Sequence, residues 1–253
     1  MSATLKRALG LLNLIATEPQ SLDDIAADSQ VHKTTIMRQL HTLEECRFVV
    51  RNDQGKYQLG SKLFELSSLA LEQRNIVQVA HPHLTALNRL TGQTIHLAAF
   101  EGPEVVYIDK LESRHSVRMY SRIGLTASLH ATAVAKVLLS ELPVERRQHI
   151  AESLNYHRYT KHTLSNAEDF LTALDTVERQ GFAFDNREHE EFVHCVAVPI
   201  RDASSHVVAA VSCSVPVVLL SQEELLALVP EIKSVAEAIS ADLGFIPTER
   251  KTL

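Results

Sequence analysis

Near the start of the chain, apolar side chains recur every three or four residues, which is the period of an amphipathic helix. The pattern predicts a helix that ends near residue 18, a short helix over residues 22–28, and a third helix from Lys33 onward. Ser21, with Asp24 three residues later, has the spacing of an N-cap with a capping acid. Few residues separate the second and third helices, so we expect a tight turn between them.

A short β-hairpin is predicted directly after the third helix. Residues 48–50 are apolar and favour one strand, and residues 56–59 favour the returning strand. The intervening residues 52–55 form a turn in which Gly55 can adopt a positive φ angle. Three helices followed by a hairpin is the order of a winged helix-turn-helix domain, which we assign to residues 1–60.

Residues 61–75 are predicted to link this domain to the rest of the chain. Leucines recur at helical spacing through residues 61–74, which contain neither glycine nor proline. A helical linker transmits orientation between domains better than a flexible one. Its apolar stripe can pack on its own domain or on a second chain.

The remaining residues, 76–253, alternate between helical and strand patterns. A helix is predicted over residues 76–90, with a kink or a break at Pro82 because proline removes a backbone donor. Ser165 and Gly181 are the expected N-cap and C-terminal stop of a later helix. The patterns further predict strands over residues 94–100, 104–111, 195–200 and 207–215, and helices over residues 131–139, 143–153, 166–180 and 221–243. Helices mixed with antiparallel strands indicate an α+β domain.

The third helix carries polar side chains where a recognition helix would meet the major groove of DNA. Ile36 and Leu40 should pack inward, which leaves the opposite side free for hydrogen bonds to base edges. The hairpin turn is flanked by basic residues, and contacts to phosphate or to the minor groove are expected there. The predicted DNA-binding residues are Lys33, Thr34, Thr35, Arg38, Gln39, Arg51 and Lys56. The alternative is a small helical domain that docks another protein.

Charge is distributed unevenly along the chain. The net formal charge is −6, from 25 Lys and Arg against 31 Asp and Glu. Residues 1–62 hold eight basic and seven acidic side chains, a net of +1, so the remainder holds 17 basic and 24 acidic, a net of −7. The acidic excess therefore belongs to the large domain and does not argue against DNA binding. Because +1 is modest, we expect the non-specific affinity for DNA to be weak and sensitive to salt.

Two further features of the composition bear on the compartment. Cys46, Cys195 and Cys213 are odd in number and widely spaced, so we expect free thiols rather than disulfides or a paired-cysteine zinc motif. The apolar stretches are too short and too polar for a membrane span or a secretory signal. We therefore expect a cytoplasmic protein that has no membrane partner.

Several motifs follow one another in order along the chain. In the N-terminal domain they are Lys33-Thr34-Thr35-Ile36-Met37-Arg38, Leu43-Glu44 and Lys56-Tyr57-Gln58-Leu59-Gly60. In the large domain they are Thr94-Ile95-His96-Leu97, Leu129-His130-Ala131-Thr132, Lys136, Gly181-Phe182-Ala183-Phe184-Asp185, Glu188-His189 and Cys195-Val196-Ala197-Val198-Pro199. Together they closely resemble the IclR family of bacterial transcriptional regulators over nearly the whole chain. The resemblance implies a winged-helix domain joined by a helix to a GAF-like effector domain, with dimers often paired into tetramers and control by a small metabolite.

The resemblance also implies that the effector binds near residues 130–132 and the strands that carry Cys195 and Ser212. The residue types agree with this, because Thr132 is a suitable N-cap and the first amides of the helix after it could hold an anionic group. Ser212 and Ser214 alternate along one strand and so share a face. The implied effector-binding residues are Met119, Ala127, Ala133, Val134, Asp185, Cys195, Ser212 and Ser214.

Three observations bear on the ligand. A carboxylate beside Asp185 would be repelled unless the ligand presents a hydroxyl or amide there, so we favour a small organic or aromatic carboxylic acid with a further polar group. Phe192 stands where the family often has glycine, and we expect it to narrow or reshape the pocket. Zinc is a minor alternative: the candidates His130, Asp185, His189 and Cys195 have suitable side chains, but no local spacing supports a site, and we expect no cofactor.

The sequence thus predicts an effector-controlled repressor that binds double-stranded operator DNA as a homodimer or a dimer of dimers. Two other functions remain open. Cys195 with His194 or His130, or Ser212 with a histidine, are nominal nucleophile–base pairs of a hydrolase, although neither sits in a strained Gly-x-Ser-x-Gly turn. The third possibility is a protein-interaction module that binds no ligand.

Overall fold

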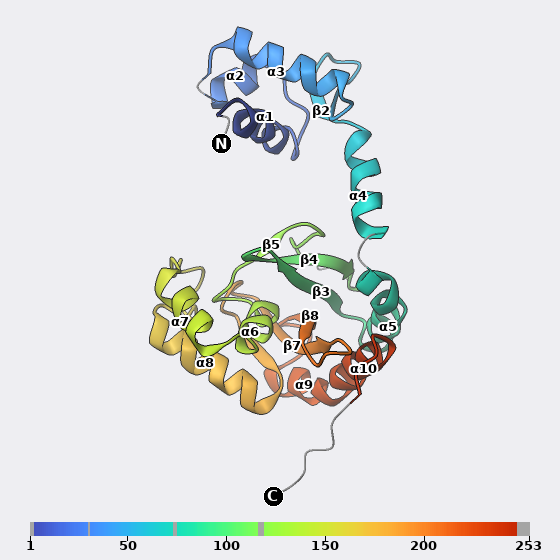
Figure 1. Cartoon of the computed structure of the whole chain (residues 1–253), viewed down its shortest axis with the longest axis vertical. Coiled ribbons are helices and arrows are strands. Elements are labelled where there is room, and N and C mark those ends of the chain that lie inside the picture. Colours follow the sequence, from blue (N-terminus) through green and yellow to red (C-terminus); the bar gives the residue numbers. More distant parts are fainter. Residues whose placement is uncertain (1–2, 30, 73–74, 116–118, 247–253) are drawn as a thin grey trace, which may run out of the picture. The chain divides into compact units, whose positions relative to one another are not determined.

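The computed structural model describes residues 3–29, 31–72, 75–115 and 119–246. The chain divides into two compact units, Met1–Asn75 and Ile76–Leu253 (Figure 1). Each unit has a hydrophobic core of its own. Within the described ranges, none of the helices is both long enough and apolar enough to cross a membrane.

The small unit is a winged helix-turn-helix, as the sequence predicts. Its elements are α1 (Ala3–Leu14), α2 (Leu22–Ser29), α3 (Lys33–Glu45), β1 (Val49–Arg51) and the antiparallel β2 (Tyr57–Leu59). Its core is built from the apolar stripes of the three helices and from Tyr57. The backbone amide of Asp24 donates to the Ser21 hydroxyl over 3.2 Å, which confirms the predicted cap of α2.

The linker helix α4 (Lys62–Glu72) begins immediately after the hairpin, and its predicted end at residues 73–74 lies outside the described residues. Gly60 allows this close connection, because a Cβ atom there would lie 2.3 Å from the carbonyl oxygen of Arg47. That same carbonyl accepts a 3.0 Å bond from the amide of Lys62, and the Arg47 guanidinium lies 2.9 Å from the Glu65 carboxylate. The start of α4 is therefore fixed to the small unit.

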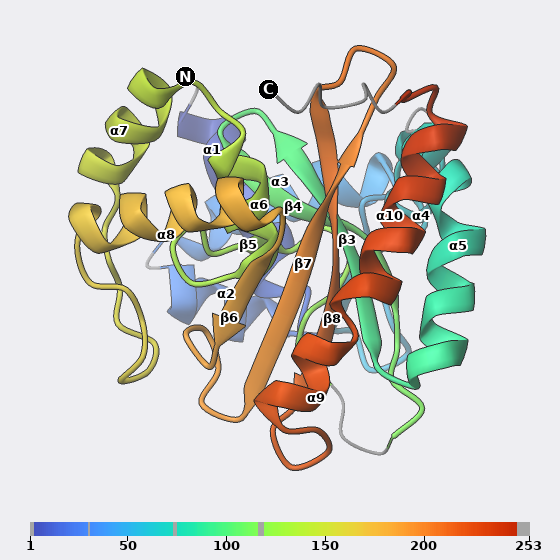
Figure 2. The ribbon, with the colours of Figure 1, turned by 90° about the horizontal axis from the view of Figure 1, so that it is seen from below.

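The large unit is built on one antiparallel six-stranded sheet in the order β5-β4-β3-β8-β7-β6 (Figure 2). The strands are β3 (Thr94–Glu101), β4 (Glu104–Leu111), β5 (Thr126–Ala127), β6 (Ala183–Asn186), β7 (Val193–Arg201) and β8 (Val207–Pro216). Four of them match the predicted strands to within two residues at each end. The sequence patterns missed the two short edge strands, β5 and β6.

Helices cover both faces of this sheet (Figure 2). We call the side under α5 (Asn75–Thr91), α9 (Gln222–Ala227) and α10 (Val229–Asp242) the closed face. The other side, the α6 face, is covered by α6 (Ala133–Ser140), with α8 (Ala167–Gln180) packed on α6 and α7 (Val144–Ser153) packed on α8.

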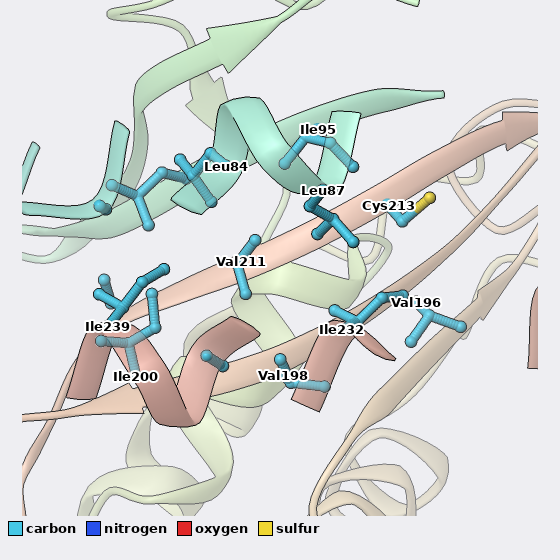
Figure 3. Close-up of a cluster of buried hydrophobic side chains, with 14 of the residues drawn as sticks. Leu84, Leu87, Ile95, Val196, Val198, Ile200, Val211, Cys213, Ile232 and Ile239 are labelled. Carbon is cyan, nitrogen blue, oxygen red and sulfur yellow. The ribbon is translucent and has the colours of Figure 1, made fainter. Parts of the chain in front are cut away.

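Side chains alternate between these two faces along each central strand. Val211, Cys213 and Val215 of β8 belong to the apolar cluster of the closed face, which Figure 3 shows with Leu84 of α5 and Ile232 of α10. The residues between them on β8 point to the α6 face. One strand thus supplies an apolar core on one side and polar side chains on the other.

Two predicted helix boundaries are wrong, and of the kink or break expected at Pro82 the break does not occur. Pro82 does not break α5, because Leu84 and other apolar residues of this helix are buried against the sheet and hold it together across the missing hydrogen bond. The last predicted helix is two helices, α9 and α10, which meet at Leu228 because Pro230 suits the first turn of a new helix. The N-cap of α8 is Asn166 rather than Ser165, and its side chain accepts a 2.9 Å bond from the amide of Asp169.

Candidate functional site

The eight residues implied as effector contacts line a single cavity of about 280 Å³ on the α6 face. They are Met119, Ala127, Ala133, Val134, Asp185, Cys195, Ser212 and Ser214. Pockets that bind small molecules commonly have volumes of about 300–1,000 Å³. The cavity therefore suits a small ligand.

Strand register brings the polar members of this set together. Asp185 of β6 is paired with Cys195 of β7, and Cys195 is paired with Ser214 of β8. Ser212, two residues earlier on β8, is paired with His96 of β3. Residues paired across antiparallel strands point to the same face. Four strands thus place these side chains in two adjacent rows on the α6 face.

Sequence reasoning missed His96 as a site residue. Its side chain is buried and lines the cavity, with Nε2 2.7 Å from the Ser121 hydroxyl and Nδ1 3.3 Å from the Ser214 hydroxyl. Burial, with a smaller contribution from Lys110, lowers the pKa of His96 to about 3, so the imidazole is neutral. Strand alternation was the available signal, because His96 lies between the apolar residues Ile95 and Leu97 and must point to the opposite face.

Asp185 is a buried carboxyl whose ionisation is finely balanced. Burial raises its pKa to about 7, against the opposing effect of the Lys136 ammonium. The amide of Glu188 donates to Asp185 Oδ1 over 2.7 Å, and Lys136 Nζ lies 2.7 Å from Glu188 Oε1. Near neutral pH a protonated fraction of Asp185 can donate a hydrogen bond to a ligand oxygen.

The N-terminus of α6 opens onto the same cavity through Ala133 and Val134. Thr132 occupies the N-cap position, but its side chain makes no cap bond and donates instead to the carbonyl of Ser128 over 2.8 Å. The prediction of a threonine side-chain cap is therefore wrong in its chemistry. The consequence is that the hydroxyl of Thr132 does not compete with a ligand for the first amides of α6.

The pairs of Cys195 with His130 or His194, and of a serine with His96, are poorly suited to hydrolysis. Burial, with the charge of Asp185, raises the pKa of the Cys195 thiol well above its usual range, which disfavours the nucleophilic thiolate. His130 and His194 are not among the residues that line the cavity. His96 lies near Ser214, but an imidazole whose pKa is about 3 is too weak a base to activate a hydroxyl at neutral pH.

The structure bears on two further points, the expected effect of Phe192 on the pocket and the minor alternative of a zinc site. Phe192 is 72% exposed and does not line the cavity, so it does not narrow it. His130 Nε2 lies 3.0 Å from the carbonyl oxygen of His157, and His130 is not among the residues that line the cavity. Across the described parts of the chain, no group of three or more His, Cys, Asp or Glu side chains is arranged to hold a metal ion.

The recognition helix α3 presents most of the predicted side chains to solvent. Lys33, Thr34 and Arg38 are exposed and Thr35 is half-buried, but Gln39 is only 8% exposed. Both polar atoms of Gln39 are buried without a hydrogen-bond partner in the described structure. The prediction that Gln39 faces DNA is wrong in orientation.

Helical phase explains this error. Position 39 falls three residues after the core residue Ile36 and directly before Leu40, so Gln39 turns toward α1, where it lines a cavity with Thr4 and Arg7. Met37 was not among the predicted DNA-binding residues, yet it is 46% exposed on α3. An exposed methyl-bearing side chain there is suited to apolar contact with a thymine methyl group.

The hairpin residues are placed at the edge of this surface. The Arg51 guanidinium is bonded to the Tyr57 hydroxyl and lies 4.6 Å from the centre of that ring, so its position is fixed by the hairpin. Lys56 precedes β2 and is half-buried. Lys33, at the start of α3, forms an ion pair with Asp23 of α2.

Family models match both units of the chain. Residues 4–53 match the IclR helix-turn-helix domain, and residues 68–241 match the bacterial transcriptional regulator IclR C-terminal domain. The HTH-type transcriptional regulator KdgR of Escherichia coli is 36% identical over 247 residues, which cover 97% of this chain and 94% of that protein. The HTH-type transcriptional repressor AllR of Salmonella typhimurium is 30% identical over 246 residues, covering 96% and 90%.

Solved structures agree with this assignment. The Thermotoga maritima IclR structure matches with a TM-score of 0.81 and 33% identity, covering 97% of this chain and all of that chain. An IclR homologue from Microbacterium hydrocarbonoxydans, solved in complex with 4-hydroxybenzoate, matches with a TM-score of 0.82 and 25% identity, covering 95% and 99%. The chain belongs to the IclR family of transcriptional regulators, and it is a metabolite-responsive DNA-binding protein rather than an enzyme.

Proposed function

We propose that this regulator is a repressor whose binding to a double-stranded operator is controlled by a small carboxylic acid in the cavity of the α6 face. The observation that carries the proposal is the convergence of the two buried serines, Asp185 and the N-terminus of α6 on one cavity of about 280 Å³. A regulator of bacterial operators acts in the cytoplasm, where the DNA lies.

The cavity favours a carboxylic acid with a second polar group. The carboxylate would accept hydrogen bonds from the amides of Ala133 and Val134, where the helix dipole stabilises negative charge. The second polar group would bond to Ser212 or to protonated Asp185. Apolar side chains such as Met119 would contact the body of the ligand. The aromatic acid bound to the Microbacterium relative has this combination of groups.

Exposed apolar side chains support the proposal of a homodimer. Leu5 and Leu9 on α1 and Phe64 on α4 are 61%, 54% and 77% exposed. Covering such surfaces with a second copy would pair two recognition helices on the two halves of a palindromic operator. The effector would then act as a population shift, by binding one arrangement of the dimer more tightly than the other.

A thermal-shift screen of small organic and aromatic acids tests the ligand proposal. A saturating acid stabilises the folded chain by mass action and raises its melting temperature. The shift should be lost in Asp185→Ala and in Ser212→Ala and kept in Ser165→Ala, which changes an exposed serine outside the cavity. An acid whose shift survives both pocket substitutions binds elsewhere and overturns the assignment.

A mobility-shift titration with DNA from upstream of the chain's own gene tests the recognition surface. Lys33→Ala and Arg38→Ala should each weaken binding, whereas Lys161→Ala, an exposed lysine of the large unit, should not. If the lost contact is to a phosphate, binding should weaken equally for all DNA sequences, and the dependence of log affinity on log salt concentration should become less steep by about 1. If the lost contact is to a base, specificity should relax at one position of the site. Unchanged binding in both α3 variants would show that another surface reads the DNA.

A further inference from the structure

His96 connects the floor of the cavity to a segment that lines its side. The Ser121 hydroxyl lies 2.7 Å from Nε2 on one edge of the ring. On the other edge, Nδ1 faces two hydroxyls, that of Ser214 at 3.3 Å and that of Ser212 at 3.5 Å. All four side chains line the cavity.

The two ring nitrogens of His96 differ in the quality of their hydrogen bonds. A distance of 2.7 Å is a normal hydrogen bond, whereas 3.3 and 3.5 Å lie at the outer limit. A neutral imidazole has one donor and one acceptor, so Nδ1 can engage only one group fully. The hydroxyls of Ser212 and Ser214 therefore retain capacity for a further polar atom beside Nδ1.

The segment at Ser121 is held by a second buried group. Lys110 is 6% exposed in its side chain, and its ammonium donates to the carbonyls of Met119 and Ser121 over 3.1 and 2.5 Å. This contact positions Met119 as an apolar contact of the cavity and Ser121 as the partner of His96 Nε2. The Nε2 edge is thus occupied by the protein itself, which leaves the Nδ1 edge for a ligand.

We propose that His96 is a specificity-determining residue, which binds a hydroxyl group of the effector at Nδ1 together with Ser212 and Ser214. A hydroxyl both donates and accepts, so it completes this network whichever nitrogen of His96 carries the proton. A carbonyl or ether oxygen can only accept a hydrogen bond, so it completes this network in only one tautomer of His96. The inference rests on the proposed effector pocket and narrows its ligand to a hydroxy acid.

Matched pairs of acids that differ in hydroxylation test this inference. The probes are glycerate against propanoate, gluconate against hexanoate, and 4-hydroxybenzoate against benzoate, each titrated by calorimetry into the full chain. The hydroxylated member of the pair that fits should bind about tenfold more tightly, the effect of one well-made hydrogen bond. The preference should fall to about twofold or less in His96→Gln, which keeps a nitrogen near the Nε2 position but removes the group at Nδ1.

Two variants serve as matched controls. His96→Asn keeps a polar atom near the Nδ1 position, and Ser121→Ala removes only the partner of Nε2. Both should retain the preference for the hydroxylated acid even if they bind all acids more weakly. Should His96→Gln fail to fold, Ser214→Ala removes the nearer partner of Nδ1 and makes the same test.

The possible failures are distinguishable. Equal binding of both members of every pair to the wild-type chain overturns the role of His96 and leaves the pocket standing. A preference that survives in His96→Gln shows that another residue reads the hydroxyl, which also overturns the inference. Binding of no acid at all to the wild-type chain overturns the proposed acid ligand and this inference together.

Discussion

The two faces of the central sheet are made by the same strands yet have opposite character. On β8, Cys213 and Val215 are sealed beneath α5 and α10, whereas Ser212 and Ser214 open onto a cavity. The closed face contributes to stability through apolar area removed from water. The α6 face has an apolar core of its own beneath α6 and α8, but beside it a cavity lined by polar and apolar side chains is left unfilled, so that part of the face is arranged for recognition. The comparison teaches that one alternating strand can serve both purposes at once.

The largest expected effect comes from charge on the α6 face. Lys136→Met removes the buried partner of Glu188 and leaves that carboxylate uncompensated beside Asp185. We expect a loss of about 3–5 kcal/mol in the free energy of unfolding, measured by denaturant titration of the full chain. The double variant Lys136→Met/Glu188→Gln should recover much of it, and a double variant as unstable as the single one would contradict this explanation.

On the closed face, the volume of the buried side chains rather than their charge should determine the free energy of unfolding. Leu84→Ala deletes a fully buried side chain of α5 and should cost about 2–5 kcal/mol of unfolding free energy. Leu90→Ala, on the same helix but 69% exposed, should change stability by less than about 0.5 kcal/mol. Under conditions in which both variants are fully folded, both should bind effector with the affinity of the wild type. A loss of effector affinity in Leu84→Ala alone would show that the two faces are not independent.

Asp185 offers a test by pH. Its pKa is about 7 in the folded chain and about 3.8 in the unfolded chain, so the folded chain binds more protons between these values. The stability contributed by this group is complete below pH 4 and is lost as the pH rises to 7. The free energy of unfolding of Asp185→Asn, relative to that of the wild type, should therefore increase by on the order of 1–3 kcal/mol from pH 4 to pH 8. Parallel stability curves for the two proteins would contradict a raised pKa.

The same residue should make effector binding depend on pH. If the ligand is an anionic acid, ionisation of Asp185 opposes it, so affinity should fall as the pH rises through about 7. The decrease should be absent in Asp185→Asn, as measured by calorimetry at pH 6 and pH 8. An affinity that rises over this range would indicate a cationic ligand instead.

The smallest effect concerns the small unit, where Gln39 resembles a core position more than a recognition residue. Gln39→Leu replaces two buried, unbonded polar atoms and should raise the free energy of unfolding by about 1 kcal/mol. DNA affinity should stay within about twofold of the wild type, in contrast with Arg38→Ala. A large loss of affinity would restore Gln39 to the recognition surface.

The sequence was most informative where local pattern and tertiary environment agree. The alternation of β3, β4, β7 and β8 and the capping pair at Ser21 could be predicted because short-range chemistry decides them. The edge strand β6, Ala183–Asn186, has few β-branched or aromatic residues, and pairing with β7 alone makes it a strand. The break considered at Pro82 does not occur, because packing against the sheet outweighs one missing hydrogen bond.

The candidate site was predictable only in part, for a related reason. The family resemblance supplied eight residues that do line one cavity. His96 was missed because it is placed in the cavity by the pairing of its strand with that of Ser212, which lies 116 positions later in the chain. Such a pairing depends on the order of strands in the sheet, which periodicity does not reveal. Gln39, in contrast, could have been placed correctly from its helical phase alone.

The register of β8 constrains how this protein can evolve. Shifting a strand by one residue exchanges its two faces, so a one-residue shift of β8 against its neighbours would turn Ser212 and Ser214 into the closed core and Cys213 into the cavity. Point substitutions at 212 or 214 leave the opposite face untouched. Ligand preference can therefore change one side chain at a time, whereas an insertion or deletion inside β8 that shifts its register would disrupt the core and the cavity together.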